Sequence, residues 1–191
     1  LSVDESFTVD EIIPEFWEDQ LLFTSLTAMI RSPDSDEPRE LRINQPLWTG
    51  WGSFIRLVNF GYAPAYQILD RKGRVMDSAV VRLGVFQPGS KDYFTPNGLP
   101  HRVYLKVYPD VEDPEAADVT STLNLRRPLL RVRITRGVLT IAERDLRLGQ
   151  PMRFEGMTLR FPEIRYYGEF ALLSDPGAPV LLFSFLLGFL G

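Results

Sequence analysis

Apolar and polar residues alternate along most of this chain, which is the pattern of strands that bury one face. The clearest case has three apolar residues at alternate positions, Leu130, Val132 and Ile134, with Arg131 and Arg133 between them. An extended backbone sends successive side chains to opposite sides. The segment therefore predicts a half-buried strand whose wet face is basic.

The segment 101–108 repeats this plan. We expect its apolar residues to face inward, namely Val103, Leu105 and Val107. The residues that we expect to face outward are aromatic or basic, namely Arg102, Tyr104, Lys106 and Tyr108. Basic and aromatic side chains are thus predicted to share one face of the sheet.

Further strands are predicted along the chain, at 22–30, 39–47, 53–60, 64–69, 78–86, 137–142 and 157–164 continuing toward 173. Turn residues separate them, as in the hairpin Asp70 to Gly73. The segment from Val9 to Gln20 is the one that could be helical, although Pro14 weakens a helix there. The predicted fold is all-β, an antiparallel β-sandwich or barrel-like domain with at most one short N-terminal helix.

The last residues, 178–191, are uncharged and almost wholly apolar. A helix that spans a bilayer needs about 20 such residues, so we expect this stretch to be a truncated start of a transmembrane helix. A buried core helix is the alternative, since ten to fourteen apolar residues also suit one. Residues 1–177 then form the β domain, either as one body or as two halves, 1–110 and 123–177, divided near Val111 to Thr122.

Composition limits the chemistry of the chain. It has 191 residues, a hydrophobic fraction of 45% and no cysteine, which excludes disulfides, thiol nucleophiles and cysteine-ligated metals. The chain begins without a signal peptide, and we expect it to be a domain of a longer membrane protein. The net charge of −4 conceals a basic segment, because residues 120–165 hold ten arginines and four acids. That segment could attract an anionic partner, or its charges could be solvated and meet opposite charges across the fold.

His101 is the sole histidine of the sequence, so the chain cannot build a catalytic triad with a spare base, a two-histidine metal site or a bis-histidine haem site. His101 could supply one axial ligand to haem, or it could be an ordinary solvated histidine. Trp48 and Trp51 flank a glycine and could form an apolar platform, or an aromatic corner at a strand end. We expect no catalytic residue and no metal site, and the acidic balance argues against nucleic acid as a partner.

Several short motifs stand out in order along the chain, namely Arg42 to Leu47, Tyr66 to Asp70, Arg136 to Gly137, Leu148 to Gly156, Phe161 to Arg165, and Ser174 to Gly177 running into the apolar segment. Together they resemble the motifs of the ResB-like cytochrome c biogenesis proteins. The resemblance extends from about Leu41 to the end of the chain. The first forty residues match weakly, and the segment between Pro109 and Leu125 is shorter than in many members.

The resemblance implies an extracytoplasmic domain of a membrane protein that works with a second membrane subunit to present haem to apocytochrome c. In such a protein the haem-binding groups would lie mainly in membrane helices, so we expect this domain to bind haem weakly or not at all. It would act as a scaffold, with Arg131 and Arg133 facing solvent or a partner. The alternative is a membrane-tethered β-sandwich that binds a peptide, glycan or lipid, using a sheet edge or the Trp48 and Trp51 platform.

Overall fold

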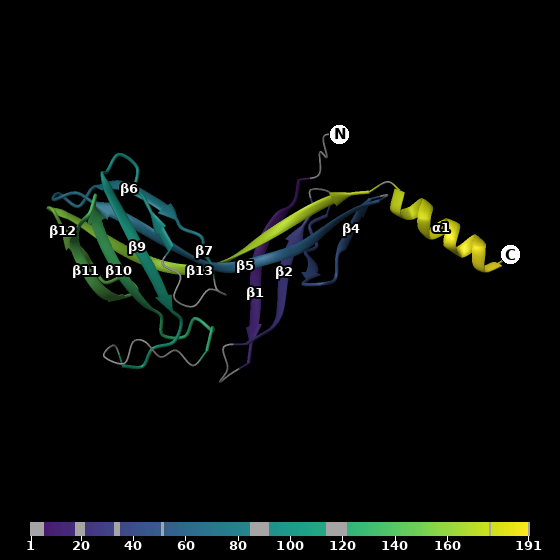
Figure 1. Ribbon diagram of the computed structural model, residues 1–191, viewed down its shortest axis with the longest axis horizontal. Helices are drawn as coiled ribbons and strands as arrows, with labels where there is room; N and C mark the ends of the chain where they lie inside the picture. Colours follow the sequence, from purple (N-terminus) through teal and green to yellow (C-terminus); the bar gives the residue numbers. More distant parts are fainter. Residues whose placement is uncertain are drawn as a thin grey trace. The chain divides into compact units, whose positions relative to one another are not determined.

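The computed structural model describes residues 6–17, 22–32, 35–50, 52–84, 92–113, 122–175 and 177–190. Within these residues the fold is mostly β, with three antiparallel sheets and one short C-terminal helix (Figure 1). The elements are β1 (Thr8–Phe16), β2 (Phe23–Arg31), β3 (Arg39–Arg42), β4 (Leu47–Gly50), β5 (Ser53–Leu69), β6 (Val75–Val80), β7 (Leu83–Gly84), β8 (Asp92–Phe94), β9 (His101–Tyr108), β10 (Leu129–Arg136), β11 (Leu139–Arg147), β12 (Met152–Phe154), β13 (Met157–Ser174) and α1 (Gly177–Leu190). The prediction of a sandwich-like all-β fold is confirmed.

The sheets have simple strand orders. The first is β1-β2-β3 and the second is β11-β10-β9-β8. The third has the order β12-β13-β5-β4, and β6 and β7 also pair with β5. The chain divides into two compact units, one made of residues 1–14, 25–59 and 168–191 and the other of residues 15–24 and 60–167. The strands β9 and β10, on either side of the interval from Val111 to Thr122, pair with each other in one sheet.

The first unit is built on apolar residues that alternate along its strands. Leu26, Ala28 and Ile30 of β2 are buried, as are Leu41 of β3 and Ile55 of β5. Gly168 of β13 permits close packing, since a Cβ there would lie 3.0 Å from Ile12 Cδ1 and 3.1 Å from Leu57 Cδ1. The alternating pattern thus places one apolar face of each strand in the core.

The second unit has a sandwich core. One side comes from β9, β10 and β11, which lie side by side in Figure 1, and its fully buried residues are Val103, Leu105, Leu130, Val132, Ile134 and Leu146. The other side comes from β5, β12 and β13, and its buried residues are Phe60, Tyr66, Ile68, Met152, Phe154, Leu159 and Phe161. Tyr66 of β5 stacks on Phe94 of β8 with ring centroids 4.3 Å apart, which joins the two sides.

The predicted hairpin at Asp70 is confirmed. The Asp70 carboxylate accepts hydrogen bonds from the backbone N–H groups of Lys72 and Arg74, at 2.8 Å and 2.9 Å. Gly73 has a φ of 78°, the left-handed conformation that glycine adopts without steric cost. These bonds fix the turn that connects β5 to β6.

The described part of the segment from Val9 to Gln20 does not form a helix. Residues Thr8–Phe16 form strand β1, in which Ile12, Pro14 and Phe16 are half-buried and the residues between them are exposed. The alternation of half-buried and exposed side chains is that of a strand. Pro14 is compatible with it because β1 lies at the edge of its sheet.

The two strands predicted at 53–60 and 64–69 form the single long strand β5. Pro64 is tolerated because it lies where the partner of β5 changes, with Tyr62 paired to Leu83 of β7 and Ala65 paired to Val80 of β6. The carbonyl of Pro64 still accepts a hydrogen bond from the N–H of Val81, at 3.0 Å.

Candidate functional site

The outward side chains of β8, β9 and β10 form a surface that we call the basic–aromatic face. Its residues are Tyr93, Arg102, Tyr104, Lys106, Tyr108, Arg131 and Arg133. The register of β9 and β10 sets this surface, because Arg131 lies opposite Lys106 and Arg133 lies opposite Tyr104. Residues opposite each other in a sheet share a face, so aromatic rings and cations are interleaved.

Each cation of this face lies over a tyrosine ring. Arg102 Cζ is 4.6 Å from the centroid of Tyr93, and Arg133 Cζ is 5.2 Å from that of Tyr104. Lys106 Nζ lies 4.5 Å and Arg131 Cζ 5.3 Å from the centroid of Tyr108. Cation–π attraction of this kind holds the basic groups in place along the sheet.

Tyr108 corrects one detail of the predicted pattern. It was expected to be exposed, and its exposed fraction is 3%. The ring packs in a buried cluster with Val111 and Leu129, and the side chains of Lys106 and Arg131 lie over it. Long basic side chains cover apolar surface in this way while their charged ends stay in water.

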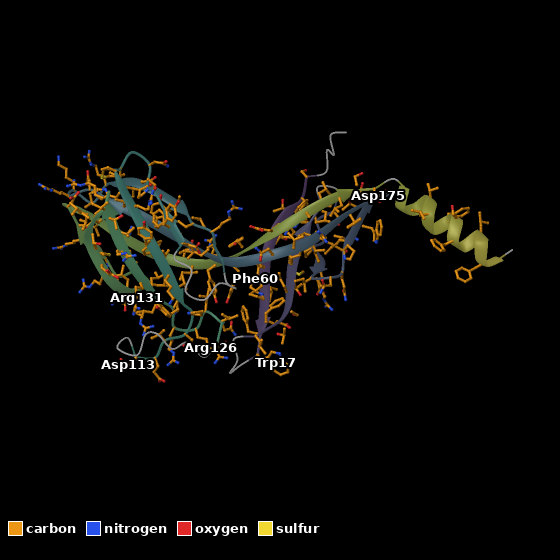
Figure 2. The ribbon with its side chains drawn as sticks, in the orientation of Figure 1. Trp17, Phe60, Asp113, Arg126, Arg131 and Asp175 are labelled. Carbon is orange, nitrogen blue, oxygen red and sulfur yellow. The ribbon has the colours of Figure 1, made fainter. Side chains whose placement is uncertain are left out.

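Arg131 is a neutralised cation. Its Nε and Nη2 donate hydrogen bonds of 3.0 Å and 3.1 Å to the two carboxylate oxygens of Asp145 on β11. Its Nη1 donates to Tyr108 Oη at 3.2 Å. The side chain, labelled in Figure 2, is 35% exposed. Arg131 therefore contributes shape and order to the face more than free charge.

Arg133 and Lys106 are different, because neither forms an ion pair with any residue that the structure describes. The Nε of Arg133 is also shielded from solvent and has no hydrogen-bond acceptor among those residues. A buried donor without an acceptor costs free energy, so this group would gain from an incoming anion.

A shallow hollow of about 220 Å³ lies between these side chains. It is lined by Tyr104, Leu105, Lys106, Tyr108, Arg131, Arg133 and Glu143. Glu143 of β11 lies opposite Arg133 in the register, but no ion pair joins them. The hollow thus offers two unpaired cations, a tyrosine floor and one carboxylate at its rim.

The other predicted partner-binding residues are not brought to this face. Trp48 of β4 is 50% exposed and packs on Phe54 with ring centroids 5.2 Å apart, and both belong to the first unit. Trp51 lies outside the described residues. Of the two residues of the predicted platform the structure therefore describes Trp48 alone, and the platform of two indoles stays a prediction.

His101 is not the solvated histidine that the sequence suggested. It is the first residue of β9 and only 3% exposed. Its Nε2 lies 2.9 Å from Glu155 Oε2, and its ring meets Phe154 edge-on at 5.3 Å. Arg136 Nη1 donates to the same carboxylate oxygen at 3.1 Å. The Nε2 of the buried histidine thus has a partner 54 positions away in the sequence.

These contacts bear on haem, the cofactor that the resemblance implies for the whole protein. The Nε2 of His101 already faces Glu155, and its Nδ1 is buried without a hydrogen-bond partner among the described residues. For His101 to bind haem iron through Nε2, the contact with Glu155 would have to break. The part of the chain that the structure describes has no group of three or more acids or histidines placed to hold a metal ion.

A second buried network was not predicted. Asp110 is 8% exposed and accepts a hydrogen bond of 2.7 Å from Arg127 Nε. This bond and the neighbouring guanidinium charges hold the pKa of the Asp110 carboxyl below its usual range. Arg147 closes the network by donating to the carbonyls of Arg127 and Val111, at 2.6 Å and 2.7 Å. Nothing in the local sequence identifies these long-range partners.

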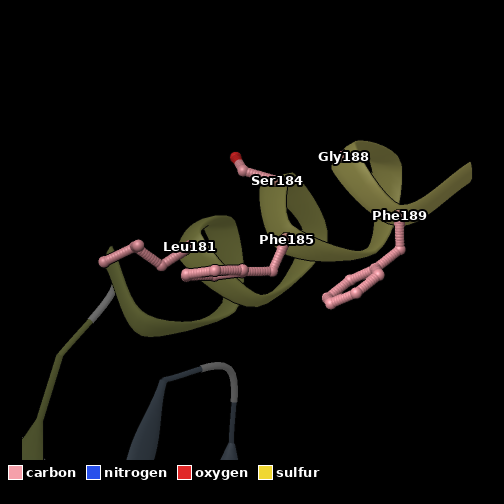
Figure 3. Close-up of a pocket in the computed structure, with 5 residues that line it drawn as sticks. All are labelled: Leu181, Ser184, Phe185, Gly188 and Phe189. Atoms are coloured by element: carbon pink, nitrogen blue, oxygen red, sulfur yellow. The ribbon is translucent and has the colours of Figure 1, made fainter. Parts of the chain in front are cut away.

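The apolar C-terminal segment forms helix α1. Its exposed side chains are large and apolar, and they are Val180, Leu181, Phe183, Phe185, Leu187 and Phe189. Figure 3 shows a groove along it, lined by Leu181, Ser184, Phe185, Gly188 and Phe189. Among the described residues, no helix combines the length and the apolar character that crossing a bilayer requires.

Comparisons of this chain with protein-family models, with curated proteins and with solved structures find no match.

Proposed function

We propose that this chain is the extracytoplasmic domain of a membrane protein that assists cytochrome c maturation, in the manner of the ResB-like proteins that it resembles. In this role it is a non-catalytic scaffold. It holds a partner, either the second membrane subunit or apocytochrome c, near the bilayer. Haem transfer itself would depend on groups outside the described residues.

The observation that carries this proposal is helix α1. An uncharged helix of 14 residues follows the last strand almost directly, and its described apolar side chains are at least 58% exposed. Leaving so many large apolar groups in water is unfavourable, so the helix needs an apolar environment such as lipid or other helices. Since β13 ends at Ser174 and α1 begins at Gly177, the β domain would lie at the membrane surface.

The motifs behind the resemblance occupy positions that shape the fold. Asn44 has a φ of 64° in the turn between β3 and β4, and Gly149 has a φ of 78° in the turn between β11 and β12. Ile68 and Phe161 are fully buried in the core of the second unit. These motifs support a shared architecture, while the partner must be recognised elsewhere on the surface.

The basic–aromatic face is the docking surface in this proposal. It combines fixed tyrosine rings with cations, and aromatic residues and arginine are the types enriched where proteins bind each other. Such a surface can bind a partner protein without catalysing a reaction. It would be consistent with the scaffold role that the resemblance implies.

The test is covalent haem attachment in the organism that encodes this chain. Deletion of its gene should abolish the haem that stays bound to c-type cytochromes during denaturing electrophoresis, because thioether bonds survive denaturation. Wild type should restore the haem. A double variant, Phe185→Asp and Phe189→Asp, should not, because charges at these positions oppose burial of α1.

Ser184→Ala, a change in the same helix that adds no charge, is the matched control and should restore haem like wild type. Haem of b-type cytochromes should stay unchanged in every strain. Normal c-type haem in the deletion strain would contradict the proposal. That result would favour the alternative role, a membrane-tethered binding module.

A further inference from the structure

We infer that the basic–aromatic face binds an extended acidic segment of a partner protein, with carboxylates at alternate positions. This inference rests on the proposed function in taking the face as a docking surface, and it adds the chemistry of what docks. The site is the hollow between Tyr104 and Tyr108, and the groups that meet the two carboxylates are Arg133 and Lys106.

Charge selects an anion. Arg133 and Lys106 lack ion-pair partners among the described residues, whereas Arg131 beside them is already paired with Asp145 through two hydrogen bonds. The incoming ligand therefore meets two available cations. The Nε of Arg133 is shielded from solvent and has no acceptor among the described residues, so a bound carboxylate would meet this guanidinium at its Nη groups or after a shift of the side chain. A carboxylate is the protein group whose geometry matches a guanidinium.

Spacing selects an extended chain. Arg133 lies opposite Tyr104 and Lys106 lies opposite Arg131, so Arg133 and Lys106 are diagonal neighbours on two antiparallel strands. Diagonal neighbours are about 7 to 8 Å apart. In an extended peptide, side chains at residues i and i+2 point to the same side and are about 6.6 to 6.8 Å apart. Two acidic residues separated by one other residue therefore match the two cations.

The size and shape of the hollow suit the carboxylate ends of acidic side chains better than a bulky ligand. The hollow has a volume of about 220 Å³, below the roughly 300 to 1,000 Å³ typical of small-molecule pockets. It lies on a sheet face and not in a closed cavity. The tyrosine rings on its floor limit hydration of the bound carboxylates, which strengthens their attraction to the cations.

The experiment uses the full chain in detergent micelles, because α1 is apolar. Its probe is a fluorescent peptide, Ser-Thr-Glu-Thr-Glu-Thr-Ser, titrated at low salt and followed by anisotropy. The matched probe, Ser-Thr-Glu-Glu-Thr-Thr-Ser, has the same composition and charge but sends its two carboxylates to opposite sides. The chain should bind the first probe at least about threefold more tightly than the matched probe, and the affinity should fall as the salt concentration rises.

Variants assign the effect to the two cations. Arg133→Gln and Lys106→Gln should each weaken binding of the first probe by about threefold to fivefold and remove the preference for it, which is the range expected of a partly exposed ion pair. Arg133→Lys should recover part of the affinity, since it restores charge without the guanidinium fork. Glu143→Gln should strengthen binding because it removes the carboxylate at the rim.

Arg39→Gln is the matched control, because Arg39 is an exposed arginine on β3 of the first unit and does not line the hollow. It should leave the preference between the two probes intact. Equal binding of both probes, or no binding of either, would overturn the inference. Circular dichroism of each variant excludes misfolding as the cause.

The outcomes separate this inference from the proposed function. The titration contains no haem and no cytochrome, so its failure leaves the haem-attachment test to decide the role of the protein. If the peptide binds as expected while the deletion strain keeps normal c-type haem, the acidic docking site stands and the maturation role falls.

Discussion

At the scale of single residues, His101 links the two sides of the sandwich in the second unit. It begins β9, and it contacts Phe154 and Glu155 at the hairpin between β12 and β13. Glu155 itself has a φ of 42°, an uncommon conformation for a residue other than glycine. The bonds from His101 and Arg136 compensate for that strained backbone.

This arrangement gives a prediction for haem. Titration of the chain with haem should produce no stoichiometric Soret shift, because the nitrogen that would bind iron already faces Glu155. The spectra of wild type and His101→Ala should be indistinguishable by absorbance. A stoichiometric shift in wild type that is lost in His101→Ala would show instead that the histidine leaves Glu155 to bind haem.

Asp110 gives a prediction for pH. Its pKa is held low in the folded state, chiefly by the hydrogen bond from Arg127. A carboxyl group with a lowered folded-state pKa stabilises the fold above its unfolded pKa of about 3.9 and loses that stabilisation as pH falls toward the folded value. Asp110→Asn should therefore lower the free energy of unfolding at pH 7 by about 1 to 2 kcal/mol. This figure is modest because Arg127 is partly exposed, and solvent screens its attraction to the carboxylate.

Denaturant unfolding at pH 7, 5 and 3 checks this prediction. The difference between wild type and Asp110→Asn should shrink at pH 3, where the wild-type carboxyl becomes protonated. Glu163→Gln breaks an exposed pair with Arg165 and serves as the control. It should change stability by less than about 0.5 kcal/mol at every pH. A difference for Asp110→Asn that stays constant with pH would refute the assignment.

The burial of both residues was beyond sequence reasoning. The partner of His101 Nε2 is 54 positions away, and the partner of Asp110 is 17 positions away. Alternation shows which side of a strand a residue occupies, but it does not show whether another element covers that side. The sequence could therefore predict where Arg131 points and could not predict that Asp145 neutralises it.

At the scale of elements, the strands β9 and β10 were predictable almost to the residue. Their alternation is strict, and turn residues lie outside their ends. Prediction was less successful where β5 runs through a proline and where β1 carries few apolar residues. In both places the structure depends on neighbouring strands, which local sequence does not identify.

Gly61 of β5 shows how closely these strands pack. A Cβ at this position would collide with the carbonyl oxygen of Leu83 and would lie 2.5 Å from the Tyr167 ring. Gly61→Ala should lower the free energy of unfolding by about 1 to 3 kcal/mol, since the paired backbone of β7 must shift to make room. Chemical denaturation measures this.

Gly73→Ala provides the contrast for that measurement. It introduces no collision, but the φ of 78° at Gly73 disfavours alanine. Its cost should come from local backbone strain of about 1 kcal/mol and should leave the contacts between strands unchanged. Wild-type stability for Gly61→Ala would mean that β5 and β7 are not paired as closely as described.

At the scale of the whole chain, the division into units is not sequential. The first unit takes residues from the beginning, the middle and the end of the chain, and the second takes the stretches between them. A boundary sought along the sequence, such as 1–110 against 123–177, assumes that each unit is continuous. Strands long enough to contribute to both units, β5 and β13, make that assumption fail.

The joint between β13 and α1 has a mechanical consequence. Just before the helix, the N–H of Asp175 donates to the carbonyl of Gly52 at 2.7 Å, and the hydroxyls of Ser53 and Ser174 are 3.2 Å apart. Hydrogen bonds between antiparallel strands run perpendicular to the strands. A pull transmitted from the helix along β13 therefore loads many of these bonds at once, in shear, instead of opening them one at a time. The strand that leads to the apolar helix is built to bear tension.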